Sequence, residues 1–491
     1  MENLQSWKIA TILLCLYGFF KELRPSEPYL TPFLLESKNV TEDEVDNQIY
    51  PIWTYSYMVS LVLVFLVTDF LLYKPVIVSE GIAYLATWSL LLWASGAMLM
   101  KLMQFFYGVA TATEIAYYSY IYAVVTPEHY QKVSSFTRSS VLIGRFFAGV
   151  LGQLLLSLNL LEYFGLNVIS MVSVSIAFLI SLSLPLVKTS VYFHTDEDLN
   201  DGSIPSDTSD TRPTDNEPIR DTEYLTPPDI NITVKQNCQS SFQRLWSDFK
   251  ACYSSRNLLQ WSFWWAFATC GYFQVGNYIQ NLWDVILYKQ SNGGSHHQVW
   301  NGAVEAAATL AGALSAFLIM FSNVNWDIFG EAILAAVSVL DAILLTFMGW
   351  TTNIWLCYAF YILFRSSYQL VITIASYQIA RHLASERFAL VFGCNTFIAL
   401  VLESILTIIF VDYRGLNLPA DTQFLVYGGY YYILAVFFTA RAVYELTTLG
   451  WRQAWRHRYR PKDAPGDDDS NSTEINHLHV PSDVTASAIN V

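Results

Sequence analysis

Residues 163–187 read YFGLNVISMVSVSIAFLISLSLPLV and contain no charged side chain. A helix needs roughly 20 apolar residues to cross a bilayer core about 30 Å thick, so this stretch predicts a membrane span. Similar stretches recur along the chain, and charged residues make up only 14% of it. Soluble proteins carry about a quarter. The sequence therefore predicts an all-α polytopic membrane protein.

The apolar stretches predict twelve transmembrane helices in two groups of six. We place them at residues 8–33, 50–72, 75–100, 102–127, 131–158, 163–187, 257–285, 299–322, 326–349, 352–383, 388–412 and 421–449. This gives an N-terminal half at 1–188 and a C-terminal half at 251–449. Residues 189–250 hold five prolines among Ser, Thr and Asp, so we expect a disordered linker. Residues 450–491 are expected to form a disordered tail.

The net charge of −14 lies in the two polar segments. Residues 196–229 carry eleven acids and two arginines, a net of −9, and residues 461–491 carry six acids and one lysine, a net of −5. The rest of the chain is balanced, so the charge does not indicate a nucleic-acid partner. The six cysteines form no CxxC or Cys/His pattern, and we expect neither a disulfide framework nor a metal site.

Lysine and arginine in the loops predict the orientation of the chain. Most of them, including the run from Arg452 to Arg460, fall on the side that holds both termini and the linker. We therefore expect these segments to be cytoplasmic and the protein to be multi-pass. The opposite side carries the glycosylation sequon at Asn39. Six helices, a cytoplasmic linker and six more helices are the plan of the major facilitator superfamily, whose halves rock about a central site.

Charged residues inside the predicted spans indicate where that site lies. An ionised group at the bilayer centre costs roughly 3 kcal/mol. Structural ion pairing explains any single one of these residues as well as a binding site does, but the whole set implies a water-filled cavity. Its members are Glu22, Arg24, Glu27, Asp69, Glu114, Arg145, Glu305, Glu331, Asp341, Arg365 and Glu403.

The first span contains Arg24-Pro25-Ser26-Glu27-Pro28. Each proline removes a backbone donor and clashes with the preceding turn, so we expect a broken helix. Its free carbonyls and Glu27 are expected to face the cavity and meet a polar solute. A simple kink would explain Pro25 but not Glu27.

Glu114 precedes a run of tyrosines that includes Tyr117, Tyr118 and Tyr120. An acid beside aromatic rings suits a flat organic cation. Tyrosines alone would be ordinary helix packing. Glu305 lies early in its span, and Asn277 lies in the preceding helix.

Several of these motifs resemble solute carrier family 19, which contains thiamine transporters and the reduced folate carrier. The resemblance covers essentially all twelve spans and spares the linker and the tail. The matching runs are Arg24–Pro28, Tyr50–Tyr57, Lys74–Val76, Thr111–Tyr122, Trp264–Thr269, Asn301–Ala306 and Arg414–Pro419.

The resemblance implies a vitamin site and separates the family's two branches. Folate carriers have basic residues where this chain has Glu114 and Glu403, so the chain looks like a carrier of a cation. The resemblance implies that Trp53 and Tyr107 stack on the substrate, that Asn277 bonds an aminopyrimidine, and that Glu27 and Glu305 meet a positive ring. The full expected set is Glu27, Tyr50, Trp53, Gln104, Tyr107, Glu114, Tyr117, Asn277, Glu305, Arg365 and Glu403.

Three positions depart from the thiamine branch. Gln104 stands where those transporters have a glutamate. Arg145 stands where an aromatic or small residue is usual, and Arg365 stands where lysine is common. The two arginines favour a phosphorylated or anionic vitamin if Arg145 enters the pocket. The alternative is that Arg145 pairs with Glu114 or Glu403.

We expect from these observations a plasma-membrane carrier that takes up thiamine by alternating access. It would need no cofactor and no catalytic residues, with proton or organic-anion coupling as possible driving forces. Another vitamin, namely pyridoxine, a thiamine phosphate or a reduced folate, is the alternative on the same fold. An integral-membrane enzyme fits less well, because the eight histidines lie in loops, span ends or tails. A receptor fits less well, because we expect neither seven spans nor a large folded outer domain.

Overall fold

The computed structural model describes residues 2–71, 73–124, 130–186, 256–290, 299–319, 326–381 and 388–449, with short pieces at 246–247, 249–250 and 253–254. The predicted linker at 189–250 lies almost entirely outside these ranges, and the predicted tail at 450–491 lies wholly outside them. The prediction of disorder for both therefore falls outside the described residues.

The described chain is helical in both halves, which confirms the predicted fold class. The N-terminal half contains α1 (Glu2–Glu22), η1 (Glu27–Tyr29), α2 (Leu30–Ser37), α3 (Glu42–Glu44), η2 (Val45–Ile49), α4 (Tyr50–Phe70), α5 (Lys74–Trp93), α6 (Ala97–Val124), α7 (Tyr130–Ser157) and α8 (Tyr163–Ser183). The C-terminal half contains α11 (Arg256–Gln290), α12 (Asn301–Ile319), α13 (Trp326–Trp350), α14 (Ile354–Arg381), α15 (Phe388–Leu406), η5 (Thr407–Val411) and α16 (Ala420–Leu449).

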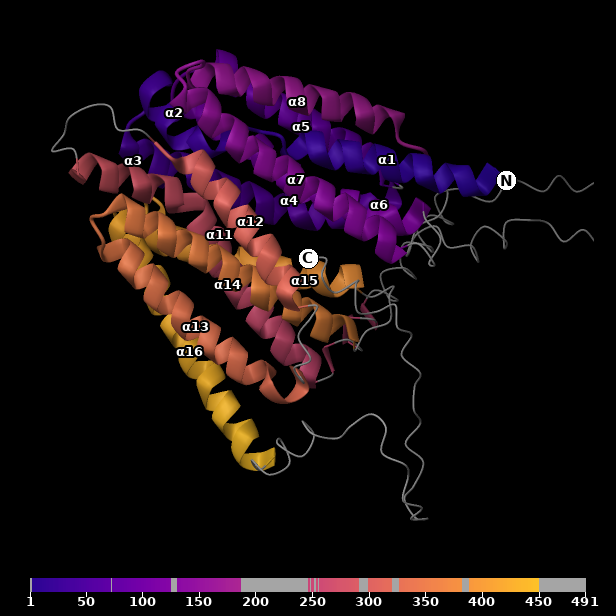
Figure 1. The fold of residues 1–491 in the computed structure, drawn as a ribbon, viewed down its shortest axis with the longest axis vertical. Coiled ribbons are helices and arrows are strands. Elements are labelled where there is room, and N and C mark those ends of the chain that lie inside the picture. Colours follow the sequence, from indigo (N-terminus) through magenta and orange to yellow (C-terminus); the bar gives the residue numbers. More distant parts are fainter. Residues whose placement is uncertain are drawn as a thin grey trace, which may run out of the picture.

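The two halves meet along two helix pairs, α7 with α12 and α4 with α15. Figure 1 shows the halves closest at the end of the molecule that carries α2 and α3, and farther apart toward the N-terminus of α1. We call the first of these ends the α2 end. Smaller contacts between the halves join α2 with α11 and η1 with α12.

Eight of the described helices are long and apolar enough to cross a membrane by composition alone. Helices α1, α6, α11 and α14 are not among them. These four carry Lys21, Glu114, Asn277 and Arg365, respectively. Such polar and charged side chains lower the hydropathy of these four helices.

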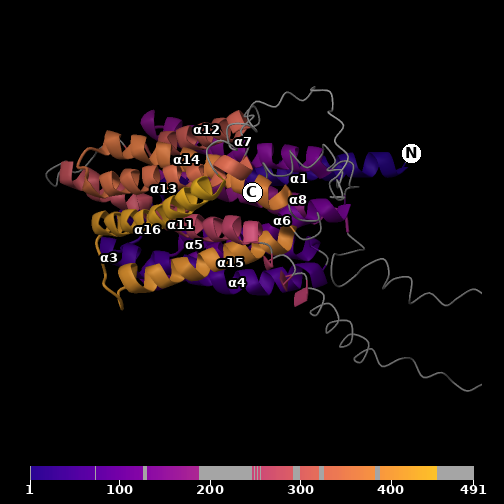
Figure 2. The ribbon, with the colours of Figure 1, turned by 90° about the horizontal axis from the view of Figure 1, so that it is seen from below.

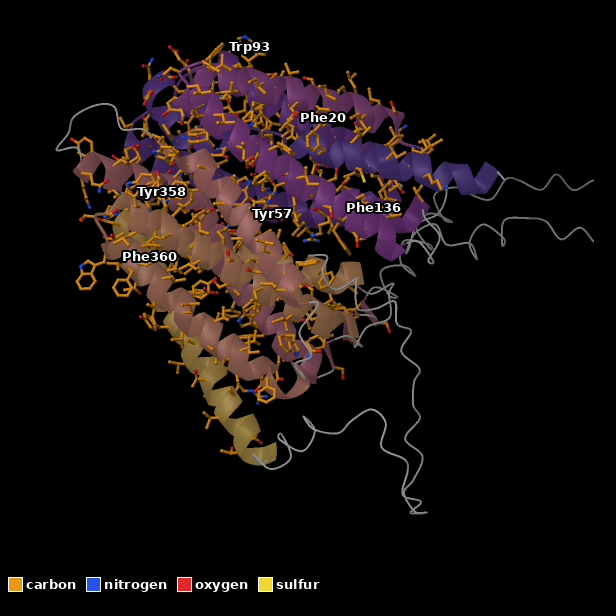
Figure 3. The ribbon with its side chains drawn as sticks, viewed as in Figure 1. Phe20, Tyr57, Trp93, Phe136, Tyr358 and Phe360 are labelled. Atoms are coloured by element: carbon orange, nitrogen blue, oxygen red, sulfur yellow. The ribbon has the colours of Figure 1, made fainter. Side chains whose placement is uncertain are left out.

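The outer surface of the bundle is apolar. The side chains of Trp93, Ile433 and Val436 are each at least 70% exposed, and Figure 3 shows Trp93 at the rim of the bundle, pointing away from the other helices. Exposed apolar residues are scattered over both halves in this way. Such a surface suits acyl chains and would be unfavourable in water.

The first span is broken as predicted. Helix α1 ends at Glu22, and the chain resumes as η1 at Glu27 and α2 at Leu30. Pro28 falls in the first turn of η1, where its missing N–H costs no hydrogen bond. The break thus places Arg24 and Glu27 in non-helical backbone or a short 3₁₀ turn.

The predicted boundary between the third and fourth spans, at residues 100–102, is wrong. Helix α5 ends at Trp93 and α6 begins at Ala97. The turn uses Gly96, whose φ of +90° is a conformation that side chains with a Cβ rarely adopt. The error arose because apolar residues continue through the turn, so hydropathy did not mark it.

Candidate functional site

Hydrogen bonds between the halves close the α2 end. Thr31 donates to Asn281 at 2.8 Å, and Asn281 in turn donates to Asp46. On another side of the same end, Tyr55 donates to Asp412 at 2.9 Å. We call this set of contacts, together with those of the next paragraph, the α2-end seal.

The broken first span supplies backbone carbonyls to the seal. Gln280 donates to the carbonyl of Glu27 at 3.0 Å, and Asn301 donates to the carbonyl of Pro28 at 3.0 Å. Sequence analysis expected these carbonyls to meet a solute. The structure instead pairs them with the opposite half, so they hold the halves together.

Two glycines bring α7 and α12 into close backbone contact beside the seal. A Cβ on Gly149 would lie 2.6 Å from the carbonyl oxygen of Gly302, and one on Gly302 would lie 2.7 Å from that of Gly149. Neither distance is tolerable for a real Cβ. Only glycine at both positions permits this approach of the two halves.

Glu27 projects from the break toward the boundary between the halves, and its side chain is 41% exposed. It accepts a hydrogen bond from Tyr107 and an ion pair from Arg24 at 3.1 Å. The Arg24 guanidinium also lies over the rings of Tyr84 and Trp88. The structure therefore joins Glu27 and Tyr107, two of the predicted site residues.

An aromatic group crosses the boundary beside these residues. The ring of Trp53 lies 5.6 Å from that of Tyr57 and 6.3 Å from that of Phe273 in the other half. Figure 3 marks Tyr57 between the two halves. Tyr50 lies nearer the α2 end, where its hydroxyl contacts Thr31. Trp53 is thus available for stacking, whereas Tyr50 belongs to the seal.

The C-terminal half contributes an acid and an arginine. Glu305 accepts a hydrogen bond from Tyr361 at 2.6 Å and lies 3.8 Å from Arg365. Arg365 also lies over the ring of Tyr272, at 4.7 Å. Asn277 is half-buried, and its amide nitrogen has no hydrogen-bond partner among the described residues. That nitrogen is itself buried, so it is an unsatisfied donor on α11.

Arg145 does not pair with Glu114 or Glu403, so the expected pairing is wrong. Its guanidinium bonds Glu22 at 2.9 and 3.1 Å while the side chain stays 40% exposed. Glu22 at the end of α1 is closer because α1 and α7 pack side by side. The positive charge of Arg145 is therefore only partly covered.

Glu114 pairs with a residue that sequence analysis missed. The ammonium of Lys21 lies 2.9 Å from Glu114 and 3.0 Å from Glu80. Sequence analysis selected neither Lys21 nor Glu80. Both residues are charged and lie inside predicted spans, and Lys21 directly precedes Glu22. Charge inside a span was therefore the signal that could have found them.

Three other predicted site residues are buried in this conformation. Tyr117 is packed inside the N-terminal half and donates to the carbonyl of Leu14. Gln104 is buried in α6. The Glu403 carboxyl is fully buried and accepts a hydrogen bond from Thr54. The structure does not bring these side chains to the exposed group around Glu27.

Asn39 is exposed at a turn with φ of +52° and precedes the capping box of α3, formed by Thr41 and Glu44.

Burial lowers the pKa of the neighbouring Lys38 amine, which donates to the carbonyl of Ala94 at 2.8 Å. The described residues contain no group of three His, Cys, Asp or Glu side chains that could hold a metal ion.

Comparison with known families agrees with this arrangement. The family model of the reduced folate carrier matches residues 5–426. The chain belongs to the reduced folate carrier family. This confirms the resemblance to solute carrier family 19, and the family's members are membrane transporters.

Members of the family differ in how similar they are to this chain. Thiamine transporter 2 of Macaca fascicularis is 48% identical over 462 residues, covering 89% of this chain and 90% of the relative. Thiamine transporter 1 of Homo sapiens is 47% identical over 450 residues, with 89% and 90% coverage. Reduced folate transporter of Homo sapiens is 36% identical over 451 residues, covering 90% and 73%.

Solved structures share the fold of this family member at low identity. The nucleoside transporter NupG aligns with a TM-score of 0.56 at 15% identity, covering 88% of this chain and 98% of NupG. A POT family transporter aligns with a TM-score of 0.58 at 9% identity, covering 89% and 96%. These similarities confirm the major facilitator superfamily fold predicted from the 6+6 layout.

Proposed function

We propose that this protein takes up thiamine across the plasma membrane by alternating access. The observation that carries the proposal is the partly exposed carboxylate of Glu27, which is bonded to Tyr107 of α6, together with Trp53, which bonds Thr111 one turn further along α6. Such a group favours a flat cationic ring through charge and cation–π attraction. Relatives named as thiamine transporters, at up to 48% identity, support the same substrate.

We assign the binding roles as follows. Glu27 and Glu114 attract the positive ring, Trp53 and Tyr107 stack on it, and the free amide of Asn277 donates a hydrogen bond. Glu305 and Arg365 complete the site from the C-terminal half. Tyr50, Gln104, Tyr117 and Glu403 support the site from buried positions.

The conformation in the structure is the inward-facing state if the termini are cytoplasmic. The α2 end then faces outward and is shut, and the halves lie farther apart at the opposite end, which faces the cell interior (Figure 1). The bias of basic residues supports this orientation. Proton or organic-anion exchange would drive uptake against a gradient, and no cofactor is required.

A second substrate class has its own support. Arg145 lies on α7 of the N-terminal half and Arg365 on α14 of the C-terminal half, and Arg145 is 40% exposed. Two arginines suit a phosphate group, so thiamine monophosphate is the alternative. Pyridoxine and reduced folate are further alternatives on the same fold.

The test is uptake of labelled thiamine by cells that express the chain, with competition by pyridoxine, thiamine monophosphate and a reduced folate. We expect saturable thiamine uptake, and we expect Glu114→Arg to abolish it while the protein still reaches the surface. Saturable folate uptake without thiamine uptake would refute the proposal. Stronger competition by the phosphate ester than by thiamine would favour the second class.

A further inference from the structure

Lys21 lies in a buried ion triad formed by three helices. Its ammonium contacts Glu80 of α5 at 3.0 Å and Glu114 of α6 at 2.9 Å. Lys21 and Glu80 are 0% exposed, whereas Glu114 is 28% exposed. Of these three side chains, only that of Glu114 is accessible to a bound molecule.

The surroundings of the triad keep Lys21 in place. Its ammonium lies 4.7 Å from the centre of the Tyr117 ring, which is itself fully buried. The second oxygen of Glu80 has no hydrogen-bond partner among the described residues. Glu80 therefore depends on Lys21 for its pairing, and the two form a contact that solvent does not reach.

The charges of the triad sum to −1, from one ammonium and two carboxylates. If Glu80 were neutral, Lys21 would cancel the charge of Glu114 and the site would lose its attraction for a cation. Because Glu80 shares the ammonium, part of the charge on Glu114 remains unbalanced. That unbalanced charge lies on the one partly exposed member of the triad.

We propose that Glu80 is a positioning residue for cation recognition. Because Glu80 shares the ammonium of Lys21, the Glu114 carboxylate keeps a net negative charge that attracts a positively charged substrate, which Glu80 itself never touches. This inference rests on the proposed function only in taking the substrate to be a cation. It assigns a role to two residues, Lys21 and Glu80, that lie behind the binding surface.

The test compares variants with different triad charges. Glu80→Gln keeps the shape of the side chain and brings the triad to zero, so we expect KM for thiamine to rise about tenfold with little change in kcat. Lys21→Met combined with Glu80→Gln returns the triad to −1, because Glu114 alone remains. This double variant should restore KM to within about threefold of the original chain.

The controls separate recognition from folding. Asp341→Asn removes another buried carboxyl, bonded to Ser367 inside the C-terminal half, and is expected to leave KM unchanged. All rates are divided by the amount of protein at the cell surface. If the methionine variant fails to reach the surface, Lys21→Gln with Glu80→Gln has the same charge and replaces it.

Two results would overturn the inference. One is an unchanged KM in Glu80→Gln, and the other is a double variant no better than Glu80→Gln, which would mean a structural role alone. Absence of thiamine uptake by the original chain would instead refute the proposed function, so the two failures are distinguishable.

Discussion

Within the N-terminal half, Arg145 on α7 donates two hydrogen bonds to Glu22 at the end of α1. The two donor nitrogens lie 2.9 and 3.1 Å from the Glu22 carboxylate. Glu22 is buried and also bonds Arg24 at 3.2 Å. One carboxylate therefore restrains two guanidinium groups next to the proposed substrate site.

Replacing Glu22 should weaken cation binding. Glu22→Gln would free Arg145 to repel a positive ring, and we expect KM for thiamine to rise by about tenfold, which equals roughly 1.4 kcal/mol. Arg145→Ala is the matched variant, because Glu22 then keeps Arg24, and KM should stay the same or fall. Equal rises in KM for both variants would contradict this account of the pair.

A side chain on Gly149 should prevent closure of the α2 end. Gly149→Val would place a methyl-bearing carbon 2.6 Å from the Gly302 carbonyl oxygen. Overpacking of this kind costs about 1–3 kcal/mol, which shifts a two-state equilibrium by roughly 5- to 150-fold. We expect greater labelling of cysteines introduced at the α2 end, measured with an impermeant thiol reagent.

Gly312→Ala is the control for that experiment, since Gly312 lies on the same helix, α12, as Gly302. A Cβ there meets only the Gln369 side chain, at 3.4 Å or more. Labelling should match that of the original chain. If both glycine variants increase labelling alike, the close contact of α7 and α12 is not what shuts this end.

Asn281 should contribute strongly to the seal. It accepts from Thr31 and donates to Asp46, and both Asn281 and Asp46 are buried. Asn281→Ala would leave Asp46 without that donor, a loss of about 1–3 kcal/mol. The same cysteine labelling should report more opening, and a double-mutant cycle with Asp46→Asn should show non-additive effects. Strict additivity would mean that the two side chains act independently.

The sequon at Asn39 should carry a glycan if the α2 end faces outward. Asn39 is exposed, so Asn39→Gln is expected to increase gel mobility by the mass of one glycan and to abolish the response to glycosidase. Asn231→Gln, at the sequon in the linker, should change nothing. A mobility shift for Asn231→Gln instead of Asn39→Gln would mean that the chain has the opposite orientation in the membrane.

The sequence predicted the fold because apolar length is a local property, and the charges inside the spans supplied the candidate site residues. Hydropathy located the helices, and Pro25 and Pro28 predicted the break. Hydropathy could not locate the turn at Gly96, where apolar residues continue. It also could not assign partners, since Arg145 and Glu22, or Lys21 and Glu80, meet only when helices far apart in sequence pack together.

Glu27 makes separate contacts through its side chain and through its backbone. Its carboxylate faces the proposed site, while its backbone carbonyl is held by Gln280 of the other half. A small molecule bound to that carboxylate and to Tyr107 in this conformation would rest on groups that the closed end holds in place. Such an inhibitor should trap the transporter with its α2 end shut. If that end faces outward, raising the external vitamin concentration should not displace the inhibitor.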